Sequence, residues 1–411
     1  MVLNLPANAQ ENQALKILNS FSIQKADLAN VNKGVSRRSA KYISRIDSTY
    51  GRHQVLEVDT LPLFAAAEYD IKLTVVEQPY VFNGDSISIS GVIIQPETSK
   101  PTPLILYMHG TVVPALKSYV PSNRVKALEK KGKTRGELLF ALSFAARGYT
   151  VVMPDYIGYG SSKGMDHPYT VQEAEGDAAI ALVQSCERTL NRDSSQKQLN
   201  GQLFIMGVSE GAGLGMGAYQ SFTAAGVKGE SRLTLEAVSL CSGPYDYASS
   251  IAWLFGEERP SEFATGIYMW SAFSIARYYQ PTLSTDSVFR KKYKKQKQIV
   301  SAWKLVTGPR QPEKWLNPNF LDLLLSEKPT VMDSAINQNT TSSFDGGKPL
   351  YLFHGEQDAV VAYLNSANTF RNLSQRGAKV YLKNFSDRGH ITIVRPYIME
   401  SIEIFNDLVN D

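Results

Sequence analysis

The stretch "FIMGVSEGAGLGMGAYQ" (residues 204–220) decides which kind of fold the chain adopts. It joins the end of an apolar run to a glycine-rich helical pattern, and two interpretations fit such a junction. In the first, Gly213, Gly215 and Ala218 belong to a loop that holds the phosphates of a dinucleotide. In the second, "GVSEG" is a G-x-S-x-G turn that exposes Ser209 as a nucleophile.

The dinucleotide interpretation fails on its context. It requires the glycines at the strand-to-helix turn and an acidic residue at the end of the next strand. Gly213 lies beyond Ser209, inside the predicted helix, and the next strand ends "AVSLCSG" (residues 237–243) without an acidic residue. A Walker phosphate loop is excluded too, because no Gly-Lys-Ser/Thr follows this stretch. The sequence therefore favours the nucleophilic serine.

Strand and helix patterns alternate around this stretch. Residues 70–76 and 86–94 alternate apolar and polar side chains, which is typical of an antiparallel, half-exposed pair. Continuous apolar runs bounded by glycine or proline predict buried parallel strands. These runs cover residues 103–110, 149–156, 203–209, 235–243, 349–355 and 378–385. With helical patterns between them, the sequence predicts an α/β fold: a mostly parallel eight-stranded sheet with helices on both faces.

The same patterns divide the chain into three parts. Residues 1–60 are polar and mixed, with a short helical pattern at 12–21, and are predicted to form an N-terminal extension. The core is predicted over residues 61–247 and 346–411. Between them, residues 248–345 contain helical patterns rich in aromatic residues and leucine but no strand pattern. We expect this segment to form a helical lid or cap over one edge of the sheet.

Composition restricts the possible partners. A hydrophobic fraction of 43% with 20% charged residues is typical of a globular protein. The net charge of +4 includes one basic run, "RKKYKKQK" (residues 290–297), but no extended basic surface, so we expect no nucleic-acid partner. The run itself predicts a solvated helix face, with peripheral contact to an anionic lipid surface as the alternative.

The two cysteines, Cys186 and Cys241, exclude a disulfide-rich scaffold and a multi-cysteine metal site, but leave a single bridge possible. No apolar run approaches the roughly twenty residues that a membrane-spanning helix needs. "ANA" at residues 7–9 has the small-x-small pattern of a signal-peptidase site. We therefore expect an exported protein, periplasmic or secreted, whose leader has been removed.

A nucleophilic serine needs a base to take its proton and an acid to orient that base. In the chain order serine, acid, histidine, the histidine follows the last strand, and among the five histidines only His390 does so. The acid should lie on the loop after the preceding strand, where Asp358 in "HGEQDAVV" is the first choice and Asp387 the fallback. Three residue types at three strand ends in the required order predict a Ser209–Asp358–His390 triad.

An oxyanion formed at the attacked carbonyl needs preorganised donors, commonly two backbone N–H groups. We expect one from Glu210, directly after the nucleophile, and the other from Thr111, on the loop after the run "LILYMHG" (residues 104–110). Aromatic residues at helical spacing are more often core than binding surface. The candidates for the substrate pocket are nevertheless aromatic: Tyr156 and Tyr159 beside the site, and Tyr268 and Trp270 in the helical insertion.

With these residues the chain resembles the α/β-hydrolase superfamily, and within it the secreted bacterial and fungal lipase/esterase branch. The motifs that carry the resemblance are "MHGT" (108–111), "VPSN" (120–123), "GYTVVMPDYIGYGSS" (148–162), "HPYT" (167–170) and "GVSEG" (207–211). The resemblance implies a serine carboxylic-ester hydrolase with a helical lid, no cofactor and no metal. Its substrate would be a small-molecule or lipid ester. The resemblance also favours export.

Two other functions stay open at this stage. A serine peptidase or aminoacyl hydrolase would have the same triad, because the triad alone does not distinguish an ester from an amide. A catalytically silent binding protein on the same fold is the other alternative. The intact serine, acid and histidine argue against it.

Overall fold

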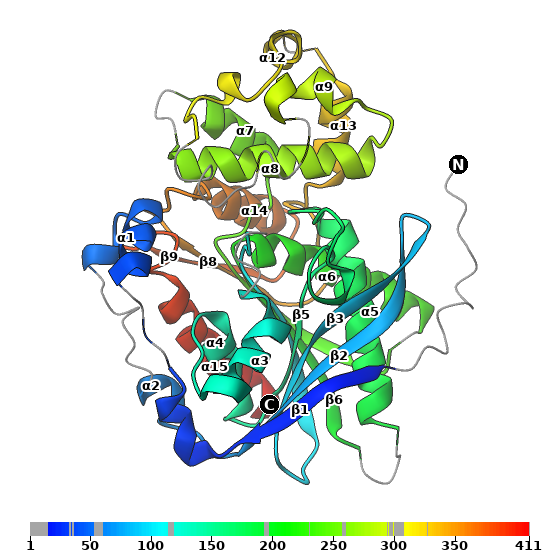
Figure 1. Cartoon of the computed structure of the whole chain (residues 1–411), viewed down its shortest axis with the longest axis vertical. Helices are drawn as coiled ribbons and strands as arrows, with labels where there is room; N and C mark the ends of the chain where they lie inside the picture. Colours follow the sequence, from blue (N-terminus) through cyan, green and yellow to red (C-terminus); the bar gives the residue numbers. More distant parts are fainter. Residues whose placement is uncertain are drawn as a thin grey trace.

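The computed structural model describes residues 15–32, 34, 37–52, 61–113, 119–192, 197–229, 231–256, 260–293, 295, 299, 308–326 and 328–410. Figure 1 shows a twisted central sheet with helices on both sides and a group of helices, α7 to α13, gathered beyond one end of it. The "ANA" segment and part of the basic run at 290–297 lie outside the described residues. In the described part of the chain, no helix has the length and apolarity needed to span a membrane.

The sheet has nine strands in the order β1-β2-β3-β5-β4-β6-β7-β8-β9. Their bounds are β1 Lys16–Ile23, β2 Ile71–Phe82, β3 Asp85–Pro96, β4 Thr102–Met108, β5 Thr150–Pro154, β6 Leu199–Val208, β7 Thr234–Cys241, β8 Leu350–Gly355 and β9 Val380–Phe385. The pairs from β1 through β3 to β5 are antiparallel, and every pair from β5 to β9 is parallel. The α/β class and the mostly parallel sheet are therefore confirmed.

The ninth strand corrects two predictions. All eight predicted strands are present, and the additional one, β1, occupies the segment for which we predicted a helix (residues 12–21). β1 is an edge strand with mostly exposed side chains; Ile17, for example, is 59% exposed. Its backbone pairs with β2 from Lys16 opposite Glu77 to Ile23 opposite Ile71. The backbone N–H and C=O groups along the open edge of β2 need hydrogen-bond partners, and residues 16–23 supply them by forming a strand. The local side-chain pattern of residues 12–21 does not reveal this pairing.

Helices cover both faces of the sheet because its parallel strands are apolar on both sides. In β4, Leu104 and Leu106 belong to the core cluster with α5 and α6, whereas Ile105 and Tyr107 belong to the cluster with α3, α4 and α15. The core helices are α3 Pro121–Lys131, α4 Glu137–Ala145, η6 Gly160–Ser162, α5 Gln172–Leu190, α6 Glu210–Lys228, α14 Leu364–Ser374 and α15 Val394–Asn410. The N-terminal segment adds η2 Lys25–Asn30, α1 Arg37–Ile46, η3 Tyr50–Arg52 and α2 Leu61–Phe64.

The segment between β7 and β8 is helical. Its described residues form α7 Tyr247–Phe255, α8 Glu262–Tyr279, α9 Thr285–Val288, η7 Lys291–Tyr293, η8 Pro312–Lys314, α12 Pro318–Leu325 and α13 Val331–Gln338. These residues contain no strand, apart from one isolated bridge between Phe289 and Leu316. They have an apolar cluster of their own around Trp270 and Trp315, which are both fully buried. The insertion is therefore packed by itself as well as against the core.

Both cysteines are free and buried. Cys186 packs in the cluster on one face of the sheet and Cys241 in the cluster on the other. The bridge that the sequence left possible is therefore absent, and each thiol serves as a small apolar side chain.

The glycines after the turn let α6 approach its neighbours closely. A Cβ at Gly217 would lie 2.0 Å from the carbonyl oxygen of Gln172 on α5, and one at Gly215 would lie 2.7 Å from the Leu240 side chain on β7. Backbone cannot move away from such a contact without separating two packed elements. These glycines therefore serve helix packing rather than phosphate binding.

We expect Gly217→Ala to lower the free energy of unfolding by about 1–3 kcal/mol through overpacking between α5 and α6. The matched control is Gly226→Ala in the same helix, where an added Cβ meets nothing within 4 Å. That substitution should raise the free energy of unfolding by about 0.5–1 kcal/mol. Urea unfolding of the two variants measures both, and equal effects would contradict close packing as the role of Gly217.

Candidate active site

Ser209 lies at the turn between β6 and α6 with an unusual backbone conformation, φ +57° and ψ −121°. Its N–H donates to the Cys241 carbonyl oxygen at 2.8 Å. A Cβ at Gly207 would be 2.2 Å from the Gly211 carbonyl oxygen, and one at Gly211 would be 2.1 Å from that of Met108. Both glycines of G-x-S-x-G are therefore required by close backbone contacts, as the motif predicts.

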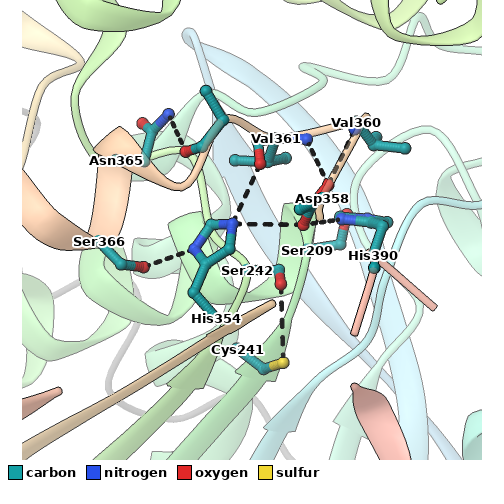
Figure 2. A network of polar contacts seen from close by, with 12 residues as sticks. Ser209, Cys241, Ser242, His354, Asp358, Val360, Val361, Asn365, Ser366 and His390 are labelled. Carbon is teal, nitrogen blue, oxygen red and sulfur yellow. Dashed lines mark hydrogen bonds and ion pairs between the residues drawn. The ribbon is translucent and has the colours of Figure 1, made fainter. Parts of the chain in front are cut away.

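The structure brings Ser209, His390 and Asp358 together in one hydrogen-bonded chain (Figure 2). The Ser209 hydroxyl donates to His390 Nε2 at 2.8 Å, and His390 Nδ1 donates to Asp358 Oδ2 at 2.7 Å. The other carboxylate oxygen, Oδ1, accepts the backbone N–H groups of Val360 at 2.8 Å and Val361 at 2.9 Å. This is the arrangement in which a histidine can take a serine proton while a buried carboxylate orients the imidazole.

A second histidine, His354, also contacts the carboxylate. Its Nε2 lies 3.2 Å from Asp358 Oδ2 and 3.0 Å from the Val361 carbonyl oxygen, and its Nδ1 lies 2.7 Å from the Ser366 hydroxyl. Because both neighbours of Nε2 are acceptors, Nε2 carries a proton and donates to them. Figure 2 shows His354 on the side of Asp358 opposite His390. His354 therefore holds the carboxylate in place, a role that its position in an "HG" pair did not reveal.

The charges of this chain shift both pKa values in the direction that a triad requires. Burial by itself would raise the pKa of Asp358, but the charge of His390 and the hydrogen bonds from both histidines hold it below its usual range. Burial would lower the pKa of His390, but the Asp358 charge and hydrogen bond outweigh it and raise the pKa above its usual value. Asp358 is therefore ionised, and it stabilises the imidazolium that forms when His390 takes a proton.

The fallback acid does not reach the histidine. Asp387 is 58% exposed at its side chain and lies 3.6 Å from Arg388 Nε. Glu356, the other acid of the "HGEQD" loop, accepts a hydrogen bond from Asn384 on β9. Asp358 is thus the carboxylate at His390, and the first choice stands over the fallback.

The two predicted oxyanion donors belong to the residue after Ser209 and to the loop after β4, and Thr111 on that loop lines the same cavity as Ser209. In the described part of the chain, the backbone N–H groups of Glu210 and Thr111 donate to no protein acceptor. The N–H of Gly110, between the strand and Thr111, is already used, because it donates to Glu137 Oε1 at 2.8 Å. The Thr111 hydroxyl lies 2.9 Å from that of Tyr169. The Thr111 N–H is therefore not used by another acceptor in the described structure, as its predicted role requires.

Behind the nucleophile, the Glu210 side chain enters a buried charge network. His167 Nε2 lies 2.7 Å from Glu210 Oε1, and its Nδ1 lies 3.3 Å from Glu175 Oε1. Burial would lower the pKa of His167, but the two glutamates outweigh it and raise the pKa to about 10. His167 is therefore a buried cation that fixes the side chain of the residue directly after the nucleophile, which the motif "HPYT" alone did not show.

A cavity of about 380 Å³ opens at Ser209 and His390. Its walls come from elements far apart in sequence: α1 (Tyr42, Ile43, Ile46), α4 (Leu139, Phe140) and α8 (Phe263, Ile267), with Val113, Val360 and Ile391 nearer the triad. Most of the lining is apolar, and Glu137 is the single acidic residue among the lining residues described. The cavity suits an apolar group bound next to the nucleophile.

The four predicted pocket residues do not line this cavity, which corrects the prediction. The Tyr156 and Tyr159 hydroxyls donate to the carbonyl oxygens of His109 and Val112 and hold the loop after β4. Trp270 stacks on Tyr169 with ring centroids 3.9 Å apart, and Tyr268 is buried in the insertion. Aromatic residues near the site in sequence thus became support and core, whereas α1, for which we predicted no function, forms a wall.

The N-terminal segment also holds the loop that carries His390. Asp47, which is 1% exposed, follows α1, and its Oδ2 accepts the backbone N–H groups of Ile391 at 2.8 Å and Thr392 at 2.9 Å. Its Oδ1 accepts both the N–H and the hydroxyl of Thr49. The Asp47 charge also contributes to the raised pKa of His390. A single aspartate thus fixes the histidine loop from a part of the chain that lacks any recognisable motif.

We expect Asp47→Asn to lower kcat by about 10²-fold. The amide NH₂ group that replaces one carboxylate oxygen cannot accept a hydrogen bond, so the loop would lose contacts that hold His390 in position. Removing the negative charge lowers the pKa of His390, so the acidic limb of the kcat/KM profile should move to lower pH. Asp322→Asn, on the exposed surface of α12, is the control. If folded Asp47→Asn protein has the acidic limb of its kcat/KM profile at the same pH as wild type, Asp47 has no electrostatic role at His390.

Comparison with known proteins places the fold and the family. A model of the X-Pro dipeptidyl-peptidase (S15) family matches residues 84–390. No curated protein matches the chain.

A putative hydrolase of Legionella pneumophila is 19% identical with a TM-score of 0.74, covering 97% of this chain and 98% of that one. The rice cell wall degrading esterase LipA of Xanthomonas oryzae is 19% identical with a TM-score of 0.71, covering 95% and 98%. Candida antarctica lipase A is 15% identical with a TM-score of 0.57, covering 80% and 75%. These likenesses establish the α/β-hydrolase fold.

Proposed function

Since the chain belongs to the X-Pro dipeptidyl-peptidase (S15) family and is a serine hydrolase of the α/β-hydrolase fold, we propose that its substrates are carboxylic esters. The observation that carries this proposal is the apolar cavity at Ser209, which suits an acyl chain and offers few polar groups for a peptide backbone. That an esterase and a lipase share the fold along most of the chain supports it. The reaction is acyl transfer, first to Ser209 and then to water.

The proposed reaction follows from the contacts of the triad. Ser209 Oγ attacks the ester carbonyl as His390 Nε2 takes its proton, and Asp358 stabilises the imidazolium that results. The N–H groups of Glu210 and Thr111 hold the oxyanion. His390 then gives its proton to the leaving alcohol, and an acyl-Ser209 intermediate remains. Water, deprotonated by the same histidine, releases the carboxylic acid and restores the serine.

The family match favours a second candidate, an X-Pro dipeptidyl-peptidase or related aminoacyl hydrolase. Such an enzyme must bind the ammonium group at the substrate's amino end, which calls for a carboxylate facing the cavity. Glu137 is the acid that lines the cavity, and its carboxyl already accepts the Gly110 N–H. Burial raises the pKa of Glu137 to about 7, so the group is partly neutral at neutral pH. These contacts make Glu137 a poor partner for an ammonium group.

Two substrate series separate the candidates. We expect nitrophenyl esters of graded acyl length to be hydrolysed faster than the nitroanilides of Gly-Pro and Ala-Pro dipeptides. Ile43→Trp should shift the preferred acyl chain to a shorter length, because the larger ring fills the cavity wall that α1 provides. Ile17→Trp, on the exposed edge strand, is the control. Faster cleavage of the dipeptide nitroanilides than of every ester would replace this proposal with the peptidase.

A further inference from the structure

A second, smaller cavity of about 120 Å³ adjoins the active-site cavity on the far side of the loop after β4. The two cavities share lining residues of that loop and of the segment before α4: Gly110, Thr111, Tyr119, Arg135, Gly136 and Glu137. The small cavity adds Pro121 and Arg124 at the start of α3, together with His109. It therefore lies where the N-terminal ends of α3 and α4 meet the loop that supplies the Thr111 donor.

Two guanidinium groups face this cavity without a counter-charge. Arg124 is 8% exposed, and its Cζ lies 3.7 Å from the centre of the Tyr119 ring; the Cζ of Arg135 lies 5.7 Å from the same ring. Arg124 Nη2 and Arg135 Nε are buried and donate to no acceptor in the described structure. No carboxylate of the described residues lies within ion-pair distance of either group.

Such an arrangement is costly for two positive charges without an acidic partner. A buried charge is normally paired, because desolvation is unfavourable unless an opposite charge or hydrogen bonds replace the lost water. Burial lowers the pKa of Arg124; the neighbouring Tyr119 opposes this shift in part, whereas the charge of Arg135 adds to it. The first turn of α4 adds the positive end of its helix dipole. At α3, Asp155 Oδ1 already accepts the Ser122 N–H at 2.9 Å, so the two arginines rather than the α3 backbone supply the positive charge there. The cavity is therefore prepared for a negative charge.

The acid on the cavity wall does not supply that charge. Glu137 Oε1 accepts the Gly110 N–H, while Oε2 is buried without a hydrogen bond of standard geometry. Burial raises the pKa of Glu137 to about 7. His109 is neutral at that pH, because burial lowers its pKa to about 4. Glu137 forms no ion pair with either guanidinium group in the described structure, and in its protonated form it can itself donate to a bound anion.

We propose that Arg124 and Arg135 form an anion subsite that binds a carboxylate carried by the ester substrate. The volume suits one carboxylate and excludes a large group. Because the two cavities share lining residues, a single ligand that spans both would place its ester at Ser209 and its carboxylate at the arginines. This inference rests on the proposed ester hydrolase function and narrows it to esters with an acidic group, such as monoesters of dicarboxylic acids.

Binding to the Ser209→Ala protein tests the subsite without turnover. The ligands are the monomethyl esters of succinate, glutarate and adipate, each compared with its neutral dimethyl ester by ligand-observed NMR at low ionic strength. We expect at least one monoester to bind about tenfold more tightly than its diester. Arg124→Gln or Arg135→Gln should remove this preference and leave diester binding unchanged, and Glu137→Gln should increase it. Arg232→Gln, an exposed arginine that lines neither cavity, is the control for net charge.

Arg124 is buried, so the Arg124→Gln protein could fail to fold. In that case Arg135→Gln still tests the subsite. Equal binding of every monoester and diester pair would overturn the proposal, as would a preference that survives both arginine substitutions. Acetate that binds as tightly as the monoesters and competes with them would show that the ester part adds no affinity, and would assign the site to a free anion instead. If wild type hydrolyses no ester while the preference persists, the proposed reaction fails and the anion subsite stands.

Discussion

Replacing Ser209 with alanine is expected to reduce ester turnover by about 10⁶-fold in kcat, since the attacking oxygen is removed and only binding and the oxyanion donors remain. Substrate affinity should change little, because Oγ contacts His390 rather than the cavity wall. The measurement is the steady-state hydrolysis of a nitrophenyl ester by the two proteins. A fluorophosphonate probe gives an independent result: it should label wild type at Ser209 and leave Ser209→Ala unlabelled.

The matched control for this variant is Ser221→Ala, in the same helix, which should retain wild-type turnover. Its hydroxyl donates to Asp177 and lines none of the cavities at the site. Ester turnover unchanged by Ser209→Ala, or a probe adduct on another serine, would show that the G-x-S-x-G turn is not the reactive centre.

Asp358→Asn should lower kcat by about 10⁴-fold while leaving the protein folded. An amide in place of the carboxylate can turn its NH₂ group towards His390, which then carries its proton on Nε2 and cannot accept the one from Ser209. The change also removes the negative charge that raises the pKa of His390. Catalysis needs neutral His390, so wild-type activity should rise with pH through a midpoint above 6.5. The midpoint of the variant should lie at lower pH.

Asp387→Asn supplies a direct control for this substitution. Asp387 is the acid nearest to His390 in sequence, yet its side chain is mostly exposed and pairs with Arg388. It should behave as wild type in both rate and pH profile. A larger loss in Asp387→Asn than in Asp358→Asn would contradict the hydrogen-bonded chain of Figure 2.

The strong predictions from sequence concerned residues whose role is fixed by the chain next to them. The turn at Ser209 needs glycine two residues before and after it, whatever the rest of the molecule does. The buried strands were recognisable because each is apolar on both faces and bounded by turn residues. The ends of parallel strands meet at one edge of the sheet, so the serine, acid and histidine could be placed together from their order alone.

Other residues gained their roles only through contacts between distant segments. β1 is a strand because β2 has an open edge. Asp47 holds the His390 loop through the Ile391 N–H, which lies 344 residues away in sequence. His354 and His167 were excluded as the triad base because neither follows the last strand, yet each is the partner of a buried carboxylate. None of these contacts leaves a spacing or a periodicity in the sequence.

By itself, the sequence determined the α/β class, the serine turn and the order of the triad, because these depend on local backbone geometry and on the regular topology of a parallel sheet. Only the tertiary structure decided which walls surround Ser209 and which charges remain unpaired. The predicted pocket aromatics Tyr156, Tyr159, Tyr268 and Trp270 turned inward, while α1 and the guanidinium groups of Arg124 and Arg135 came to the cavities. Packing depends on shape and burial summed over the whole molecule, and a residue's type alone does not encode its neighbours.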